Sequence, residues 1–394
     1  MQTRSRPAAS MAPGTDPAAL RVITTAVLVG LVASGVALAS GLGLLAGGAA
    51  APRPWTGRAP ANGPAQAAGL RLLREAAQAC RSLPYQGVEL AWWGRGSRAG
   101  GDTSVVQVWH RPGGRALTQE PGAPVLTQPP AASPSASGQH QPVAPLGTSG
   151  PNPDGAGALG MSTRLVSLLA ANYEVTVAGR GQVAGRPARI ITVRRPGGGV
   201  AAWFWLDSAT SLPLRKEMFD ARSHLISSVA FTEVSIGPGA VSGEPAATAS
   251  AWRTTLAPGQ LARLRASGWP LPGPLPGDLT LIAAKESTTP AGPVVDLDYS
   301  DGLSVVSIFV QRGYLPTPLH GWSQVALAGH KVYASDPDEL CFAWAARGFV
   351  YTLIAAAPQQ TVGQVVVALP HDDGPGWLAR LKHGLQRMLS WVRP

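Results

Sequence analysis

The chain has 394 residues, which is room for two or three domains, and it contains 47 glycines, 37 prolines and only 14% charged residues. This composition favours short strands, turns and proline-rich linkers over a helical bundle. The formal net charge of +10 is carried mainly by arginine. It is typical either of a protein that meets an anionic partner or of an arginine-rich surface without a specific role.

The first element is an apolar segment at residues 22–50 that contains no charged side chain. Its 29 residues (50 − 21) exceed the roughly 20 that a helix needs to cross a bilayer, where every backbone hydrogen bond must be internal. Arg4, Arg6 and Arg21 precede it, so the positive-inside rule places the N-terminus in the cytoplasm. We therefore expect a cytoplasmic arm at residues 1–21, a single-pass signal anchor in the cell membrane, and an extracytoplasmic remainder.

A cleaved signal peptide is the alternative, because Ala37–Ala39 and Ala49–Ala51 offer small-residue cleavage sites. The apolar run is longer than the core of a usual signal peptide, about 7–15 residues, which favours the anchor. Export follows from either interpretation, so we expect no nucleic-acid partner. Anionic lipid headgroups or an acidic protein suit the positive charge better.

The first folded region is expected at residues 67–237, after a flexible tether at residues 51–66. Apolar residues at helical spacing predict helices at residues 67–82 and 161–171, and Ser162 or Thr163 is expected to cap the second. A Pro- and Ser-rich stretch is predicted to be a disordered insertion at residues 121–154. Antiparallel strands are expected at residues 88–92, 103–110, 115–119, 173–178, 189–194, 201–206, 212–219 and 225–234.

A second composition shift predicts an interdomain linker at residues 238–273, with a short helix at residues 258–266. A smaller domain follows at residues 274–371, in which Ser300-Asp301-Gly302 is a strong hairpin signal. Thr361 is expected to cap a closing helix at residues 361–368. Strands are expected at residues 280–284, 294–299, 303–311, 324–327, 331–333, 342–345 and 349–355.

Several of these stretches resemble the RseB/MucB family over roughly residues 67–371, the insertion excluded. In the first region they are Leu83–Gly87, Ser104–His110, Leu159–Ser162 and Phe204–Asp207 running on to Leu212–Arg215. In the second region they are Tyr299–Gly313 and Phe349–Thr352.

The resemblance implies an α+β fold, with a LolA-like curved antiparallel β-sheet that carries helices on its concave face. A smaller, mainly antiparallel β/α domain would follow, both behind the N-terminal transmembrane helix. Members of the family regulate an extracytoplasmic-stress sigma factor by binding the outer part of a membrane anti-sigma factor, and they are associated with sensing stray lipids or lipoproteins. Typical members are soluble periplasmic proteins, so the membrane segment and the insertion are departures.

Motifs for catalysis are missing, since no G-x-S-x-G, H-E-x-x-H or Cys/His zinc spacing occurs. We interpret His371–Asp373 as an exposed turn rather than a metal site, and Gly179–Gly181 as a hairpin turn rather than a phosphate loop. We therefore expect neither an enzyme nor a bound cofactor or metal. A hydrolase with an unrecognised site is the remaining alternative.

Apolar residues of the first region carry the binding hypothesis, because the covered face of a curved sheet lines an acyl-chain pocket in a carrier. A solid core is the alternative, since periodicity reports burial and not empty space. Trp203 and Trp205 fall on the face opposite Phe204 and mark either a partner surface or ordinary cover by loops. The lipid-cavity candidates are Val88, Leu90, Trp92, Val106, Val108, Leu165, Leu169, Phe204, Val229 and Phe231.

Two cysteines, Cys80 and Cys341, lie in different predicted domains. A disulfide between them is permitted outside the cytoplasm, and the alternative is two unrelated buried thiols.

The C-terminal tail at residues 372–394 is predicted to be a basic amphipathic helix that lies in a membrane interface. Docking of the same apolar face on the second domain is the alternative. The membrane-interface candidates are Trp377, Arg380, Leu381, Lys382, Leu385, Arg387 and Met388.

The predicted function is that of a membrane-anchored extracytoplasmic regulatory or binding protein of the RseB/MucB type. It would modulate an anti-sigma factor or a related envelope-stress pathway and sense lipids or lipoproteins. The alternative is an anchored LolA/LppX-like carrier of lipids or lipoproteins.

Overall fold

The structure is a computed structural model, and it describes residues 63–94, 101–112, 116–119, 158–243, 254–289, 292–315, 319, 321–335 and 340–372. The predicted cytoplasmic arm, signal anchor and insertion lie outside the described residues, as do the tether up to residue 62 and the tail beyond residue 372. Within the part of the chain that is described, no helix is both long and apolar enough to cross a membrane.

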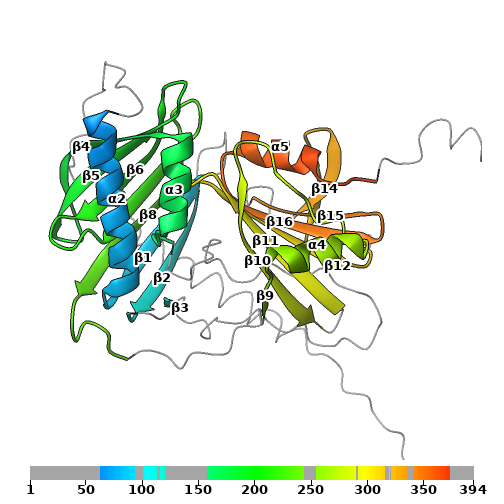
Figure 1. Cartoon of the computed structure of the whole chain (residues 1–394), viewed down its shortest axis with the longest axis horizontal. Helices are drawn as coiled ribbons and strands as arrows, with labels where there is room; N and C mark the ends of the chain where they lie inside the picture. The colour runs from blue at the N-terminus through cyan, green and yellow to red at the C-terminus, as the bar shows by residue number, and fades with distance from the viewer. Residues whose placement is uncertain are drawn as a thin grey trace, which may run out of the picture. The chain divides into compact units, whose positions relative to one another are not determined.

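The first region is built on an eight-stranded antiparallel sheet, in the order β3-β2-β1-β8-β7-β6-β5-β4 (Figure 1). Neighbours in the chain are neighbours in the sheet, except that the connection from β3 to β4 passes from one edge to the other and carries helix α3. The strands are β1 (Tyr85–Gly94), β2 (Gly101–His110), β3 (Leu117–Gln119), β4 (Glu174–Val183), β5 (Arg186–Arg194), β6 (Val200–Asp207), β7 (Pro213–Phe219) and β8 (Leu225–Ile236).

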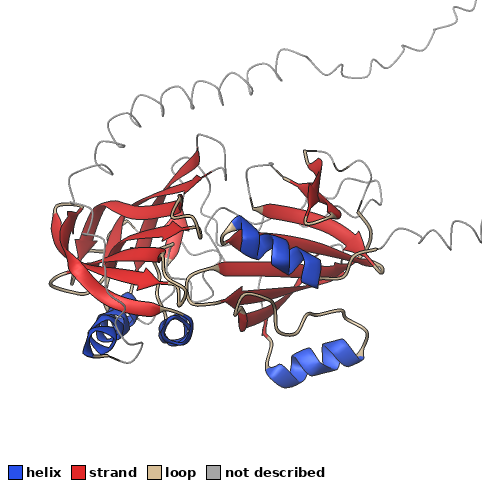
Figure 2. Cartoon of the chain, turned by 90° about the horizontal axis from the view of Figure 1, so that it is seen from above, coloured by secondary structure: helices blue, strands red, loops and turns tan. Residues whose placement is uncertain are grey.

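Two helices, α2 (Pro64–Ser82) and α3 (Thr163–Asn172), cover one face of this sheet (Figures 1 and 2). Helix α2 begins with a proline, whose missing N–H is no loss in the first turn. Ser162 caps α3 as expected, because its Oγ accepts a hydrogen bond from the Leu165 amide at 3.2 Å. Helix α2 approaches β4 so closely that a Cβ at Gly69 would lie 2.8 Å from the Val175 carbonyl oxygen.

The second region is another eight-stranded antiparallel sheet, in the order β13-β14-β15-β16-β12-β11-β10-β9. Its apolar face packs with two helices, α4 (Pro258–Ala266) and α5 (Gln359–Ala368), through residues such as Leu297, Ile308 and Val362. The strands are β9 (Thr254–Thr255), β10 (Thr280–Thr289), β11 (Gly292–Ser300), β12 (Val305–Arg312), β13 (Ser323–Leu327), β14 (His330–Ala334), β15 (Cys341–Ala346) and β16 (Phe349–Ala356).

The two sheets confirm the predicted α+β class, and Ser300-Asp301-Gly302 does join two antiparallel strands. Gly179–Gly181, however, is not a hairpin turn. It lies inside β4 next to a bulge, and the chain turns at Ala184 and Gly185, both of which have positive φ.

Two further expectations differ from the structure. Thr361 lies within α5, whose N-cap is Pro358. The first helical hydrogen bond already runs from the Val362 amide to the Pro358 carbonyl at 3.1 Å, so the helix begins before Thr361 and has no side-chain cap. Composition assigns residues 238–273 to a linker. In the structure, however, β9 pairs with β10, and α4 packs into the second core. Composition alone does not reveal these contacts, because the apolar runs that make them are short and lie between prolines.

Candidate functional site

Strand register decides which candidate residues share a face, because residues paired across neighbouring strands point to the same side. Phe204 pairs with Lys216, which pairs with Val229. Val106 and Phe231 are both opposite Glu89 and belong to the same set. We call this side of the first sheet, beneath α2 and α3, the roofed face.

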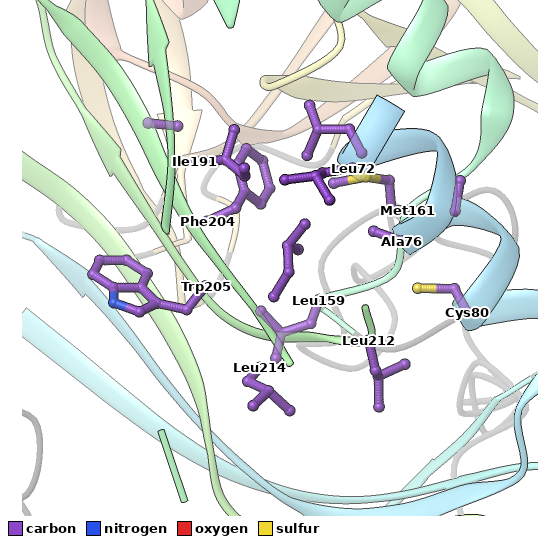
Figure 3. Close-up of a cluster of buried hydrophobic side chains, with 14 of the residues drawn as sticks. Leu72, Ala76, Cys80, Leu159, Met161, Ile191, Phe204, Trp205, Leu212 and Leu214 are labelled. Carbon is purple, nitrogen blue, oxygen red and sulfur yellow. The ribbon is translucent and has the colours of Figure 1, made fainter. Parts of the chain in front are cut away.

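The roofed face holds six of the ten lipid-cavity candidates, and a seventh, Leu165 of α3, is buried outside the hydrophobic cluster of the first sheet. Figure 3 shows Phe204 and Ile191 directed toward Leu72 of α2. Leu169 of α3 is fully buried in the same cluster. The six residues on the roofed face are Val106, Val108, Leu169, Phe204, Val229 and Phe231.

The other three candidates, Val88, Leu90 and Trp92, were placed on the wrong face. Leu90 pairs with Val105 and Ala230, and its row of the sheet continues to Arg215 and Trp205. The roofed positions of β1 carry Gly87, Glu89 and Ala91 instead. A glycine and a glutamate therefore occupy the covered side of this strand, which is why apolar alternation indicated the opposite side.

Glu89 is an acidic group enclosed on the roofed face, with only 3% of its surface exposed. Its Oε2 accepts a hydrogen bond from the Ala158 amide at 3.2 Å. Burial raises the pKa of Glu89 to about 7, although the amides of Ala158 and Leu159 act in the opposite direction. Glu89 thus holds the segment that leads into α3 and titrates near neutral pH.

Lys216 is the basic counterpart on the roofed face. Its ammonium lies 5.8 Å from the centre of the Phe204 ring and donates a hydrogen bond to the Leu303 carbonyl at 3.2 Å. Desolvation lowers the pKa of Lys216 to about 8, while the charge of Asp301 raises it. Leu303 belongs to the connection between β11 and β12, so this lysine of the first sheet is bound by the second.

The face opposite the helices carries an aromatic cluster, as expected for Trp203 and Trp205. Trp205 points away from Phe204 (Figure 3), and the two tryptophan rings meet edge to face at 6.1 Å. The guanidinium of Arg215 lies 4.7 Å from the Trp205 ring and forms an ion pair with Glu217. Trp205 is only 3% exposed, so this residue is packed rather than presented to solvent.

The second sheet contains a buried charge cluster that sequence reasoning missed. The ammonium of Lys285 lies 2.9 Å from Asp298 and 3.6 Å from Asp296, and Ser307 donates a hydrogen bond to Asp298. Desolvation and the neighbouring Asp298 charge raise the pKa of Asp296 to about 8. Its signal in the sequence was the alternation of two aspartates with apolar residues in Val295–Tyr299.

The remaining candidates concern sulfur and metal chemistry. No disulfide joins Cys80 and Cys341, both of which are buried thiols. Burial raises the pKa of Cys80 to about 12, which makes its thiol a poor nucleophile. The His371 ring stacks on the His330 ring, with 3.8 Å between the ring centres, instead of lying in an exposed turn. The described residues contain no group of three or more metal-binding side chains.

An antiparallel sheet roofed by two helices and followed by a second antiparallel sheet defines a two-domain α+β protein. Residues 156–256, from the approach to α3 through β9, match the family described as the MucB/RseB N-terminal domain. This part of the chain is similar to that family, which confirms the resemblance found in the sequence.

A curated relative gives a second likeness. The sigma factor AlgU regulatory protein MucB of Pseudomonas aeruginosa is 30% identical over 157 residues, which are 39% of this chain and 47% of that protein. The match thus spans about half the length of the curated relative.

Solved structures give more distant likenesses. A crystal structure of MucB aligns with 78% of this chain and 100% of its own, at 22% identity and a TM-score of 0.47. The Pseudomonas aeruginosa MucA/MucB complex aligns with 77% and 98%, at 22% identity and a TM-score of 0.41. A LolA superfamily protein from Nitrosomonas europaea aligns with 42% and 92%, at 11% identity and a TM-score of 0.19.

Proposed function

We propose that this chain is an extracytoplasmic regulatory protein of the RseB/MucB type that binds the outer part of a membrane anti-sigma factor. The observation that carries the proposal is the family match over residues 156–256, which contains α3 and most of the roofed sheet. The relative with 30% identity is a sigma factor regulatory protein, and binding rather than catalysis is the activity expected of this class. The partner itself is inferred from the family.

Anchoring in the membrane is part of the proposal, with residues 22–50 as the span and Arg4, Arg6 and Arg21 on the cytoplasmic side. A reporter enzyme fused after Pro394 is expected to be active only outside the cytoplasm. Cytoplasmic activity of the fusion would exclude this topology. The basic tail would strengthen membrane attachment, since an anchored chain meets the headgroups at high effective concentration.

The decisive experiment is capture of the full-length tagged chain from its native membrane, followed by mass spectrometry of what accompanies it. We expect a membrane protein with a cytoplasmic sigma-binding part. A control chain with Leu169→Glu, which places a carboxylate in the core beneath α3, should lose that partner together with its fold. Recovery of equal amounts of partner with this control would mean that the capture is nonspecific.

A lipid or lipoprotein carrier is the second candidate, and one observation favours it. The roofed face combines a large apolar surface with one desolvated ammonium, Lys216, next to Phe204. That combination suits an acyl chain with an anionic end. Native mass spectrometry of the purified full chain should then find acyl chains, and Lys216→Met should reduce anionic lipids relative to Lys331→Met, an exposed lysine of β14.

A further inference from the structure

The connection between β11 and β12 is a preformed turn at residues 300–304, which we call the docking turn. The Asp301 carboxylate accepts hydrogen bonds from the amides of Leu303 at 2.8 Å and Ser304 at 2.7 Å. Ser300 Oγ donates to the Ser304 carbonyl at 2.7 Å and accepts from the Gly302 amide at 2.9 Å. Because its own groups satisfy one another, the docking turn is a rigid element.

Helix α3 of the first region contacts this turn at its C-terminal end. Tyr173 donates its hydroxyl hydrogen to the Asp301 carboxylate at 2.8 Å, and the Asn172 amide donates to the Asp301 carbonyl at 2.9 Å. Leu303 is 3% exposed and is part of the hydrophobic cluster of the first sheet. The turn of one region is therefore buried in the core of the other.

Gly302 sits directly against the backbone of α3. Its φ is +103°, and a Cβ at this position would lie 2.9 Å from the Leu169 Cα and 3.0 Å from the Leu165 carbonyl oxygen. Only glycine permits both this φ and this approach. The contact therefore fixes the helix axis and not merely a side chain.

The other end of α3 is held as well. The Arg164 guanidinium donates hydrogen bonds to the carbonyls of Ile282 at 2.7 Å and Leu281 at 2.6 Å. A bulge in the pairing of β10 with β11 occurs between Leu281 and Ala283. The fork of arginine suits two neighbouring acceptors of this kind.

We propose that α3 is a shared element that couples the two regions, so that α3 cannot leave the roofed face without releasing the second sheet. Contacts at both of its ends and along its middle belong to the second region, while Leu169 and Val166 belong to the core of the first. Any ligand or partner that lifts α3 would therefore change the freedom of the second sheet. This last consequence rests on the proposed function, whereas the coupling itself does not.

Hydrogen exchange of the full chain, followed by mass spectrometry, tests the coupling with Gly302→Ala. The added methyl group collides with the Leu169 backbone, so we expect α3 amides to exchange about tenfold faster or more, the factor expected for one lost hydrogen bond of ordinary strength. Amides of the docking turn should exchange faster as well.

Gly292→Ala is the matched control, because Gly292 has a φ of +114° and no atom within 4 Å of an added Cβ. Both variants carry the same kind of backbone strain, but only one disturbs α3. Exchange in α3 that rises equally in both variants, or in neither, would overturn the coupling.

Arg164→Gln gives an independent answer if Gly302→Ala does not fold. It removes the two hydrogen bonds to β10 from a side chain at the surface, and it should also speed exchange in α3. Arg180→Gln, on an exposed part of β4, is its control. Unchanged exchange of α3 in Arg164→Gln would contradict the proposal even if the anti-sigma partner is confirmed.

Discussion

On the roofed face of the first sheet two enclosed charges, Glu89 and Lys216, are each hydrogen-bonded to a backbone group of a distant segment. In the second sheet Lys285, Asp296 and Asp298 lie on the face away from the helical core and form ion pairs with one another. The surroundings of Glu89 and Lys216 therefore change if the segments that carry Ala158 and Leu303 move. The charges of Lys285, Asp296 and Asp298 depend on each other and on Ser307 of the neighbouring strand, so they concern stability more than conformation.

The largest effect is expected from breaking the paired cluster with Lys285→Met. Removal of the cation leaves two carboxylates, Asp296 and Asp298, buried side by side. Losing one partner of a buried ion pair costs about 3–5 kcal/mol. Urea unfolding should show this loss, while Lys331→Met, an exposed lysine of β14, should change stability little. Equal stability of the two variants would mean that the cluster is open to water.

Glu89→Gln is expected to have a smaller effect, and to raise the stability of the folded chain rather than lower it. Burial raises the pKa of Glu89 from 4.5 to about 7, so the folded state prefers the protonated form. Its contribution to stability is complete below pH 4.5 and is lost as the pH rises through 7. Glutamine stays neutral, so at pH 8 the variant should be more stable than the natural chain by up to about 3 kcal/mol.

Unfolding at pH 4 and pH 8 measures this difference. Glu233→Gln, an exposed glutamate on the neighbouring strand β8, should show no such pH dependence. A Glu89→Gln variant that is less stable than the natural chain at pH 8 would show that the charged carboxylate is needed to hold Ala158.

The smallest effect is expected at helix α3. Ser162→Ala removes the cap of α3 and should cost about 1 kcal/mol. Because α3 is also held by the second region, the loss should appear in thermal unfolding of the whole unit rather than as fraying of one helix. Ser82→Ala, whose Oγ donates to the Gln78 carbonyl near the end of α2, should have a smaller effect.

Local patterns in the sequence predicted most of the elements, because apolar spacing and turn residues act over a few positions. Helix 258–266 was predicted to the residue, and the strands differ from expectation mainly in length. The error on β1 arose where a glutamate and a glycine occupy covered positions, so local polarity opposed the true orientation. The segment at residues 22–50 remains a prediction.

The candidate site was predictable only in part, because its distinctive contacts join residues far apart in the chain. Val108, Leu169 and Phe204 could be found from periodicity, which reports burial. Nothing near Lys216 in the sequence indicates that it binds Leu303, 87 residues later. The Asp296 and Asp298 pair was visible, but its partner Lys285 lies on another strand.

The pairing of β1 with β8 has a consequence for biogenesis. Thr232 Oγ1 donates a hydrogen bond to the Val88 carbonyl across 144 residues of sequence, so the centre of the first sheet closes only after most of the chain has been made. Pairings between residues so far apart in the chain form slowly, and the strand edges stay unpaired and exposed until they form. A chain exported from its N-terminus would therefore emerge as an unfinished sheet, with β1 and β2 in need of protection until β8 arrives.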